Sequence, residues 1–274
     1  MLPKFQQFSR ERQYLSNVSP ATLEWYKHSF KWLLSESPSQ DDLKDAVLRM
    51  REKGLKATGC NSAIRAINAY LKWSGSLAKI AQLKEPQIIL PTFSRVQVRS
   101  LLNYKPHGFY QRRLHLLVLV LVLMDTGCRI TEALTLHVVD IDMDNLLVTL
   151  DGKGRKQRKV PFSLELRKAL FRYVADYCKP DSLLLASRNN TLLGRRVMLR
   201  DVKLLCKRLG LNPPARTLHA FRHTFAVNYL RQGGSVFHLQ KVLGHSTLEM
   251  TRRYANLLTE DLQAVHQRCS LLAA

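Results

Sequence analysis

The chain has 274 residues, and 46% of them are hydrophobic, so it can bury the core of one large domain or two ordinary ones and is not a disordered chain. Lys and Arg outnumber Asp and Glu by 43 to 21, and the net charge of +22 points to a polyanionic partner, nucleic acid before an anionic membrane. The five cysteines are scattered without a C-x-x-C pair, which argues against a disulfide framework or a zinc site of that type.

Nothing in the first residues has the pattern of a secretory signal. The apolar run at 114–124 has about half of the roughly 20 residues that a membrane span needs. We therefore expect a cytoplasmic protein with no membrane partner, in which this run forms a buried helix.

Residues 1–86 have the pattern of a small helical module. Ser19 followed by Pro20 is a typical helix start, and apolar residues at three- and four-residue steps predict helices. These helices are expected at about 20–34, 39–53 and 58–74. Many lysines and arginines lie between and beside them. This basic surface has two interpretations: a solvated face, or a helical bundle that contacts the DNA backbone.

A linker is expected at 87–93, because Pro86 and Pro91 interrupt helix formation at both of its ends. It would separate the helical module from a second domain at 94–274. Ser94 is expected to start the first helix of that domain.

The second domain is expected to be mainly helical with one small antiparallel β-meander. Strands at 146–150 and 158–161 flank a hairpin tip at 151–156, and a third strand is expected near 139–141. Thr217 is the expected N-cap of a helix that carries two candidate site residues. The helices are expected at about 94–102, 112–125, 129–134, 163–177, 195–209, 218–231 and 235–243.

A short stretch near the C-terminus gathers groups that can bind an anion and move a proton. His219 and Arg222 lie three residues apart near a helix N-terminus, His245 follows in a turn, and Tyr254 lies near the end of the next helix. A tyrosine hydroxyl is a poor nucleophile at neutral pH, since its pKa is about 10. Its place among these groups suggests covalent chemistry on a phosphate.

Each candidate has an ordinary interpretation when it is taken alone. A histidine on a helix is usually structural, and Tyr254, which follows two arginines, has the setting of a half-buried surface residue. Lys153 in its glycine-flanked hairpin suits a flexible turn, and Arg129 after Gly127 suits a helix cap. The argument for a catalytic site therefore depends on the whole set.

Together these residues resemble the tyrosine recombinase family, also called the phage integrase family, and in particular its compact Xer-type members. The family's motif is Arg, Lys, His-x-x-Arg, His or Trp, and Tyr in that order, and each position is filled here. The matching residues are Thr126-Gly127-x-Arg129-x-x-Glu132, Gly152-Lys153-Gly154, His219-x-x-Arg222, Leu243-Gly244-His245 and Tyr254. The resemblance is strong over about 92–260, and 1–86 is more loosely similar to the family's core-binding domain. It implies two domains that form a C-shaped clamp on DNA.

The resemblance implies a site-specific DNA recombinase that cuts and rejoins strands through a 3′-phosphotyrosyl intermediate. Tyr254 is then the expected nucleophile. Arg129 and Arg222 are expected to hold the non-bridging oxygens of the phosphodiester, because guanidiniums stay charged and donate hydrogen bonds in pairs. His245 is expected to add a donor to the same oxygens.

Three further residues have implied roles beside the nucleophile. Lys153 resembles the general acid that protonates the leaving 5′-oxygen, and His219 matches an acid/base group near the tyrosine. Glu132 is expected to orient its neighbours. No metal and no nucleotide cofactor is implied, since neither a carboxylate ligand cluster nor a phosphate-binding loop accompanies the motif. Rejoining needs no ATP, because the covalent link stores the bond energy.

Double-stranded DNA is the implied partner, bound by a homo-oligomer that is a tetramer in the synaptic complex. An apolar pattern at 257–272 predicts a C-terminal helix that packs either on its own protomer or on a neighbour. Two alternatives stay open: DNA relaxation of the type IB topoisomerase kind, and a DNA-binding protein without catalysis. The residues do not choose between integration, excision, inversion and dimer resolution, nor do they identify a DNA site.

Overall fold

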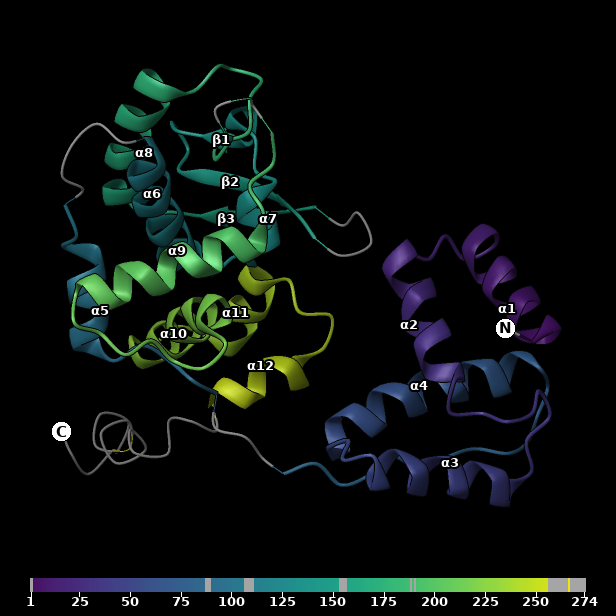
Figure 1. Ribbon diagram of the computed structural model, residues 1–274. Helices are drawn as coiled ribbons and strands as arrows, with labels where there is room; N and C mark the ends of the chain where they lie inside the picture. The colour runs from purple at the N-terminus through teal and green to yellow at the C-terminus, as the bar shows by residue number, and fades with distance from the viewer. Residues whose placement is uncertain are drawn as a thin grey trace. The chain divides into compact units, whose positions relative to one another are not determined.

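A computed structural model describes residues 2–86, 90–105, 111–152, 157–187, 189, 191–255 and 266. The chain divides into two compact units, Met1–Ile88 and Ile89–Ala274, whose elements are labelled in Figure 1. The chain is mainly α-helical with a small antiparallel sheet, as predicted. Within the described ranges, no helix combines the length and the apolar character that crossing a membrane requires.

The N-terminal unit is a helical bundle around an aromatic core. Its helices are α1 (Pro3–Tyr14), α2 (Pro20–Phe30), α3 (Gln40–Glu52) and α4 (Ala57–Trp73). The Ser19 hydroxyl accepts a hydrogen bond from the Thr22 amide, and Ser39 forms a capping box with Asp42. These two caps explain where α2 and α3 begin. The three predicted helices of this unit are present, but the first was expected to reach residue 34 and ends at Phe30.

Helix α1 was not among the predicted helices. Its composition is polar, but Phe5 and Phe8 are both buried and pack against Phe30 and Tyr70. The stacked and edge-on ring contacts have centroid distances of 4.6 to 5.7 Å, within the range of favourable aromatic pairs. The tertiary packing of these two side chains therefore stabilises a helix that the local sequence pattern does not predict.

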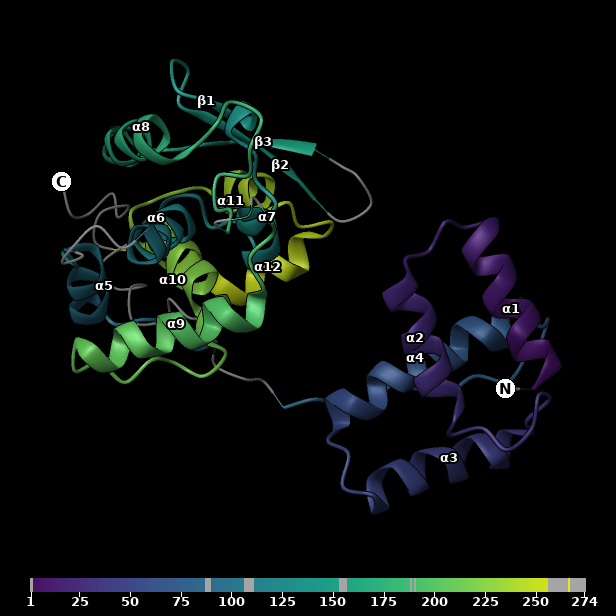
Figure 2. The same cartoon turned by 45° about the horizontal axis from the view of Figure 1, so that its top comes forward.

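The C-terminal unit is built around the buried helix α6, which packs against α8, α9 and α10. Its helices are α5 (Arg95–Leu102), α6 (Gln111–Thr126), α7 (Ile130–Leu134), α8 (Leu164–Tyr177), α9 (Arg195–Arg208), α10 (Thr217–Arg231), α11 (Val236–Leu243) and α12 (Leu248–Ala255). They confirm the predicted helices to within a few residues. Helices α10, α11 and α12 pack on one another, and the two views in Figures 1 and 2 show them together.

The described strands of this unit form an antiparallel sheet in the order β1-β2-β3, at one end of the unit (Figure 2). The strands are β1 (Ile141–Asp142), β2 (Leu147–Asp151) and β3 (Gln157–Pro161). Val148 pairs with Ile141 on one side and with Val160 on the other. The predicted meander is confirmed, although Val138–Asp140 is a 3-10 helix and not part of the third strand. That turn is held by the Asp140 carboxylate, which accepts from the His137 amide.

The expected N-cap at Thr217 is wrong. The cap residue is Arg216, whose φ of 55° lies in the left-handed region, and Thr217 is the first residue of α10. The Thr217 hydroxyl donates to the Pro214 carbonyl at 3.0 Å and so stabilises the loop before the helix. The Thr217 side chain faces back to this loop, and no side chain caps the first turn of α10.

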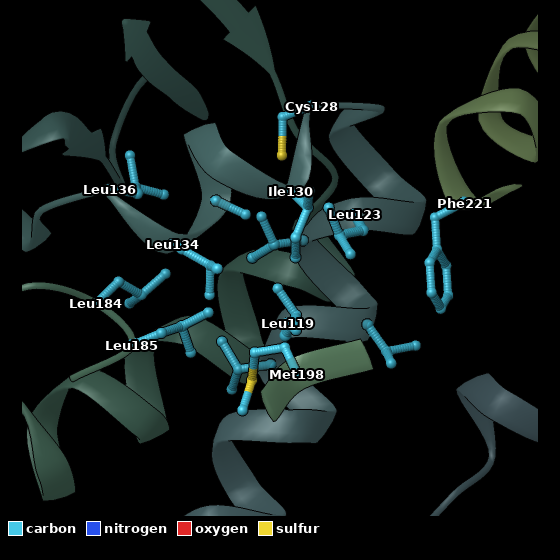
Figure 3. Packing of buried hydrophobic residues seen from close by; sticks show 14 of the residues in the cluster. Leu119, Leu123, Cys128, Ile130, Leu134, Leu136, Leu184, Leu185, Met198 and Phe221 are labelled. Carbon is cyan, nitrogen blue, oxygen red and sulfur yellow. The ribbon is translucent and has the colours of Figure 1, made fainter. Parts of the chain in front are cut away.

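The core of the C-terminal unit fixes the elements that carry the candidate site. Figure 3 shows Leu119 and Leu123 of α6 beside Ile130 of α7, with Phe221 of α10 on the same side chain cluster. All four side chains are fully buried or nearly so. The α6–α7 turn and the start of α10 are therefore positioned by one continuous apolar core.

Candidate active site

The turn between α6 and α7 depends on Gly127. Its φ is 62°, and a Cβ added there would lie 2.3 Å from Phe225 Cδ1, so both conformation and space favour glycine. The Thr126 hydroxyl donates to the Val122 carbonyl and accepts from the Cys128 amide. This sharp turn places Arg129 at the N-cap of α7.

Glu132 joins two arginines from separate elements. Its carboxylate accepts from Arg129 Nη1 at 2.7 Å, from the Arg129 amide at 2.8 Å, and from Arg158 Nη1 and Nη2 at 3.0 and 2.8 Å. Arg158 lies on β3, and its Nε donates to the Val242 carbonyl at the end of α11. The Glu132 side chain is 4% exposed, so this bridge is buried. It ties the hairpin, α7 and α11 to one another.

The pKa of Glu132 is lowered by this bridge. Burial alone raises it, but the hydrogen bonds from Arg158 and Arg129, together with the charge of Arg158, outweigh that effect. Glu132 is therefore ionised and orients Arg129, whose Nη2 lies 3.5 Å from the Gly244 carbonyl oxygen. The supporting role predicted for Glu132 remains a proposal, and the contacts that favour it are these.

Arg222 is buried at the centre of the site. It is 7% exposed, and it donates from Nη1 to the Gly127 carbonyl at 3.0 Å and from Nη2 to the Leu243 carbonyl at 2.7 Å. Burial and the nearby charge of Arg129 lower its pKa to about 10, so it stays protonated at neutral pH. Arg222 thereby connects the α6–α7 turn to the end of α11.

Tyr254 points into the same site from α12. The residue is 4% exposed, and its Oη lies 3.0 Å from Nδ1 of His223. Its ring is parallel to that of His245, with an interplanar angle of 6° and 6.2 Å between the centroids. Burial raises the pKa of the phenol, while the charge and hydrogen bonding of Arg222 act in the opposite direction. The phenol is therefore protonated at neutral pH and sits beside a guanidinium.

His245 follows the turn at Gly244, whose φ of 65° ends α11. Its Nδ1 lies 2.8 Å from the Thr251 hydroxyl, which holds the ring against Tyr254. Burial and the charges of Arg222 and Arg129 lower the pKa of His245 to about 4, so the imidazole is neutral at pH 7. In the tautomer in which Nδ1 accepts from the Thr251 hydroxyl, the ring carries its hydrogen on Nε2 and can donate it toward a ligand.

His219 lies one turn before His223 on α10 and is exposed. Desolvation lowers its pKa, as do the charges of Arg195 and Arg216 and, more weakly, those of Arg222 and Arg129. The charges of Arg222 and Arg129 thus act on His219, but among the described contacts its ring has no hydrogen bond to Tyr254. The contact with the phenol is made by His223 instead.

Five of the seven predicted site residues come together in the described structure. They are Arg129, Glu132, Arg222, His245 and Tyr254. His219 lies at the edge of this group, and Lys153 falls outside the described residues. Strands β2 and β3, which flank its hairpin, are described up to Gly152 and from Gln157.

Sequence reasoning missed His223 and Arg158. His223 directly follows Arg222 in the sequence, and that position was its only signal. Arg158 stands in a predicted strand, where a charged residue suggests a solvent-facing position. In the described part of the chain, no group of three or more His, Cys, Asp or Glu side chains is arranged to hold a metal ion.

Comparison with known proteins shows which family the chain resembles. The sequence pattern of the phage integrase family matches residues 92–261. The tyrosine recombinase XerA of Pyrococcus furiosus is 27% identical over 267 residues, which cover 94% of this chain and 91% of that protein. XerD of Yersinia pestis is 28% identical over 263 residues, with 90% and 87% covered. The Tn1549 transposon integrase, solved in complex with transposon right end DNA, has a TM-score of 0.73 at 20% identity and covers 98% of this chain and all of that one.

Proposed function

The chain belongs to the phage integrase family, and from that premise we propose how its own residues carry out the reaction. It is a tyrosine recombinase, a site-specific DNA recombinase that cleaves and religates strands. We assign the nucleophile to Tyr254, which attacks a phosphodiester and forms a 3′-phosphotyrosyl bond as the 5′-oxygen leaves. The reverse attack by a 5′-hydroxyl rejoins the strand and frees the tyrosine.

One observation carries this assignment. The Tyr254 phenol is buried, with its Oη against His223, its ring parallel to that of His245 and the charge of Arg222 nearby. A structural tyrosine would be satisfied by a single acceptor. The surplus of donors beside the phenol suits a phosphate that arrives with the DNA.

Arg129 and Arg222 are proposed to hold the non-bridging oxygens of that phosphate. A guanidinium has five N–H donors, and the two described bonds of Arg222 to backbone carbonyls leave donors of Arg222 unused. The Arg129 side chain is 32% exposed, so it can reach a ligand while Glu132 holds its Nη1. Charge that develops on the pentacoordinate phosphorus is stabilised by donors already in place. His245 adds a further donor.

Proton transfer to the leaving 5′-oxygen is proposed for Lys153, at the tip of the β2–β3 hairpin. A general acid must reach its acceptor, and a hairpin tip can approach the DNA without moving the core. His219 is proposed as an acid/base group at the edge of the site, which suits its exposure and its position near both arginines. No step in this scheme draws on a metal or a nucleotide cofactor.

Binding to double-stranded DNA is proposed to involve both units, arranged as a C-shaped clamp. The domains are then a core-binding bundle at 1–86, a linker at 87–93 and a catalytic domain at 94–274. The net charge of +22 supports a binding energy dominated by phosphate contacts. We further propose that the active assembly is a homo-tetramer on two DNA duplexes. The C-terminal segment at 257–272, of which the structure describes residue 266 alone, is the proposed contact between protomers.

The assignment of Tyr254 is tested by trapping the covalent intermediate. Bound fragments are first selected from random-sequence duplex DNA with the Tyr254→Phe variant, because the cognate site is unknown. The selected site is then built as a nicked suicide substrate, from which the short 5′-hydroxyl strand diffuses away after cleavage. The wild-type chain should form an adduct stable to denaturant, and Tyr254→Phe should form none. An adduct of equal yield in Tyr254→Phe would exclude this nucleophile.

The same reagents separate recombination from DNA relaxation. Supercoiled plasmids with and without the selected site are incubated with the wild-type chain. A recombinase should exchange strands at the selected site and leave the plasmid without it supercoiled. Processive relaxation of both plasmids would instead indicate topoisomerase-like activity by the same chemistry.

A further inference from the structure

The contact between His223 and Tyr254 joins two helices that are far apart in sequence. His223 lies on the second turn of α10 and Tyr254 near the end of α12, and the two helices pack on each other. The distance from Nδ1 to Oη is 3.0 Å, and the ring centroids are 5.7 Å apart. Since Tyr254 is 4% exposed, little water competes for this hydrogen bond.

The direction of this hydrogen bond follows from its surroundings. Burial and the nearby His219, Arg222 and Arg216 lower the pKa of His223 to about 4, so its ring is neutral at pH 7 and has one accepting nitrogen. Arg222 has donors alone, so it cannot accept the phenol hydrogen, and its nearby charge favours ionisation of the phenol, against the burial that raises the pKa of Tyr254. The phenol hydrogen is then left to point at His223 Nδ1. The contact with His223 Nδ1 therefore fixes the rotation of the hydroxyl.

Fixing a nucleophile in this way matters for the rate. An attack on phosphorus requires the oxygen to lie in line with the leaving group, and displacement by about 1 Å can slow such a step about 10²-fold. Tyr254 is carried by a short helix near the end of the described chain, whereas His223 is carried by α10, whose neighbouring Phe221 is fully buried in the core. The hydrogen bond therefore transmits the rigidity of the core to the reacting oxygen.

We propose that His223 is the positioning residue of the nucleophile: its Nδ1 accepts the Tyr254 hydrogen bond and holds Oη beside Arg222 before cleavage. This inference rests on the proposed role of Tyr254 and adds to it a residue outside the motif on which that role was based. His219, one turn away, keeps its separate place at the edge of the site.

The test compares His223→Ala with His223→Asn in the full-length chain on the suicide substrate. In asparagine, Oδ1 is attached to Cγ as Nδ1 is in histidine, so it can accept the same hydrogen bond. We expect His223→Ala to form the covalent adduct about 10²-fold more slowly, with DNA affinity unchanged, and His223→Asn to stay within about tenfold of wild type. A purely structural defect would lower the thermal midpoint and would not be rescued by one side chain atom. His238→Asn, an exposed histidine on α11, is the matched control.

A second substrate shows on which side of the reaction His223 acts. A 5′-bridging phosphorothiolate has a sulfur leaving group that needs no proton, so it bypasses a missing general acid. Lys153→Ala should recover on this substrate, whereas His223→Ala should stay slow, because its defect lies in the attacking oxygen.

Three results would overturn the proposal: an Ala variant as fast as wild type, an Asn variant as slow as Ala, or full recovery of His223→Ala on the sulfur substrate. If the wild-type chain formed no adduct, or Tyr254→Phe formed one, the proposed function would fail instead. The two failures are therefore distinguishable.

Discussion

Arg222 donates a hydrogen bond of 2.7 Å to the backbone oxygen of Leu243, and its second donor reaches Gly127 at 3.0 Å. A candidate phosphate ligand thus holds together two backbone segments that surround it. The neighbouring carbonyl, that of Gly244, faces Arg129. The chain just before His245 is therefore anchored by the same two arginines that are proposed to bind DNA.

Arg222→Lys should affect both stability and catalysis. Lysine has one charged nitrogen and cannot reach both carbonyls, so one buried acceptor loses its partner, which costs about 1–3 kcal/mol. We expect the free energy of unfolding to fall by that amount in urea titrations, and the rate of adduct formation to fall by at least 10²-fold. Unchanged stability would mean that the two carbonyl contacts do not hold the fold.

Glu132→Gln tests the buried bridge to Arg158. Removing one partner of a buried ion pair typically lowers the free energy of unfolding by about 3–5 kcal/mol, because the other charge stays buried. The exposed pair of Glu249 and Arg252, 3.9 Å apart in the same unit, is the control, and Glu249→Gln should cost less than about 1 kcal/mol. Both pairs lie in the C-terminal unit, and the unfolding of that unit is measured by hydrogen exchange with mass spectrometry. Equal effects of the two substitutions would contradict the burial of the bridge.

The three tryptophans give this experiment an internal reference. Trp25, Trp32 and Trp73 all lie in the N-terminal unit, so tryptophan fluorescence reports on that unit alone. We expect Glu132→Gln to shift the transition followed by hydrogen exchange in the C-terminal unit and to leave the fluorescence transition in place. A common shift would show that the two units unfold together.

The neutral histidines predict a pH dependence of stability. His223 and His245 have pKa values near 4 in the folded chain, lowered from 6.5, and the unfolded chain takes up their protons first. Their contribution to the free energy of unfolding is complete above pH 6.5 and is lost as the pH falls from 6.5 toward 4. Urea titrations at several pH values in this window give the free energy of unfolding at each pH. This free energy should change less steeply with pH in the His223→Asn, His245→Asn double variant than in the wild-type chain.

Gly127→Ala should be more harmful than an equivalent change elsewhere. Gly210 has a similar φ of 68° but open space around it, so Gly210→Ala measures backbone strain alone, about 1 kcal/mol. At Gly127 the added methyl group also meets Phe225, which should lower the free energy of unfolding by a further ~1–3 kcal/mol. Thermal denaturation of both variants gives the difference. Equal midpoints would show that Phe225 moves away freely.

Much of the fold could be predicted because local signals agree with tertiary packing. Ser94 and Ser163 cap helices where the apolar pattern begins, and the apolar run of α6 is indeed buried. Arg129, Arg222, His245 and Tyr254 were found by their order in the chain, which needs no knowledge of their distances.

The remaining features depend on tertiary contacts that the spacing of residues in the sequence does not reveal. His223 meets Tyr254 because α10 and α12 pack together, and Arg158 meets Glu132 because β3 lies beside α7 and α11. Neither partner is within helical or strand spacing of the other, so no periodic pattern marks the pair. Helix α1 was missed for a similar reason, since Phe5 and Phe8 find their partners on other helices.

The double duty of Arg222 determines which inactive variant suits structural work on DNA complexes. Many enzymes become more stable when a catalytic group is removed, because active sites contain groups held against their preferences. Here the reverse is expected, since the guanidinium fastens two loops to the core. A variant with Arg222 replaced would be both inactive and destabilised, and its crystal structure would show a distorted active site. Tyr254→Phe removes one oxygen from a buried ring and keeps both hydrogen bonds of Arg222 to the backbone. It is therefore the better inactive variant for capturing the DNA complex before cleavage.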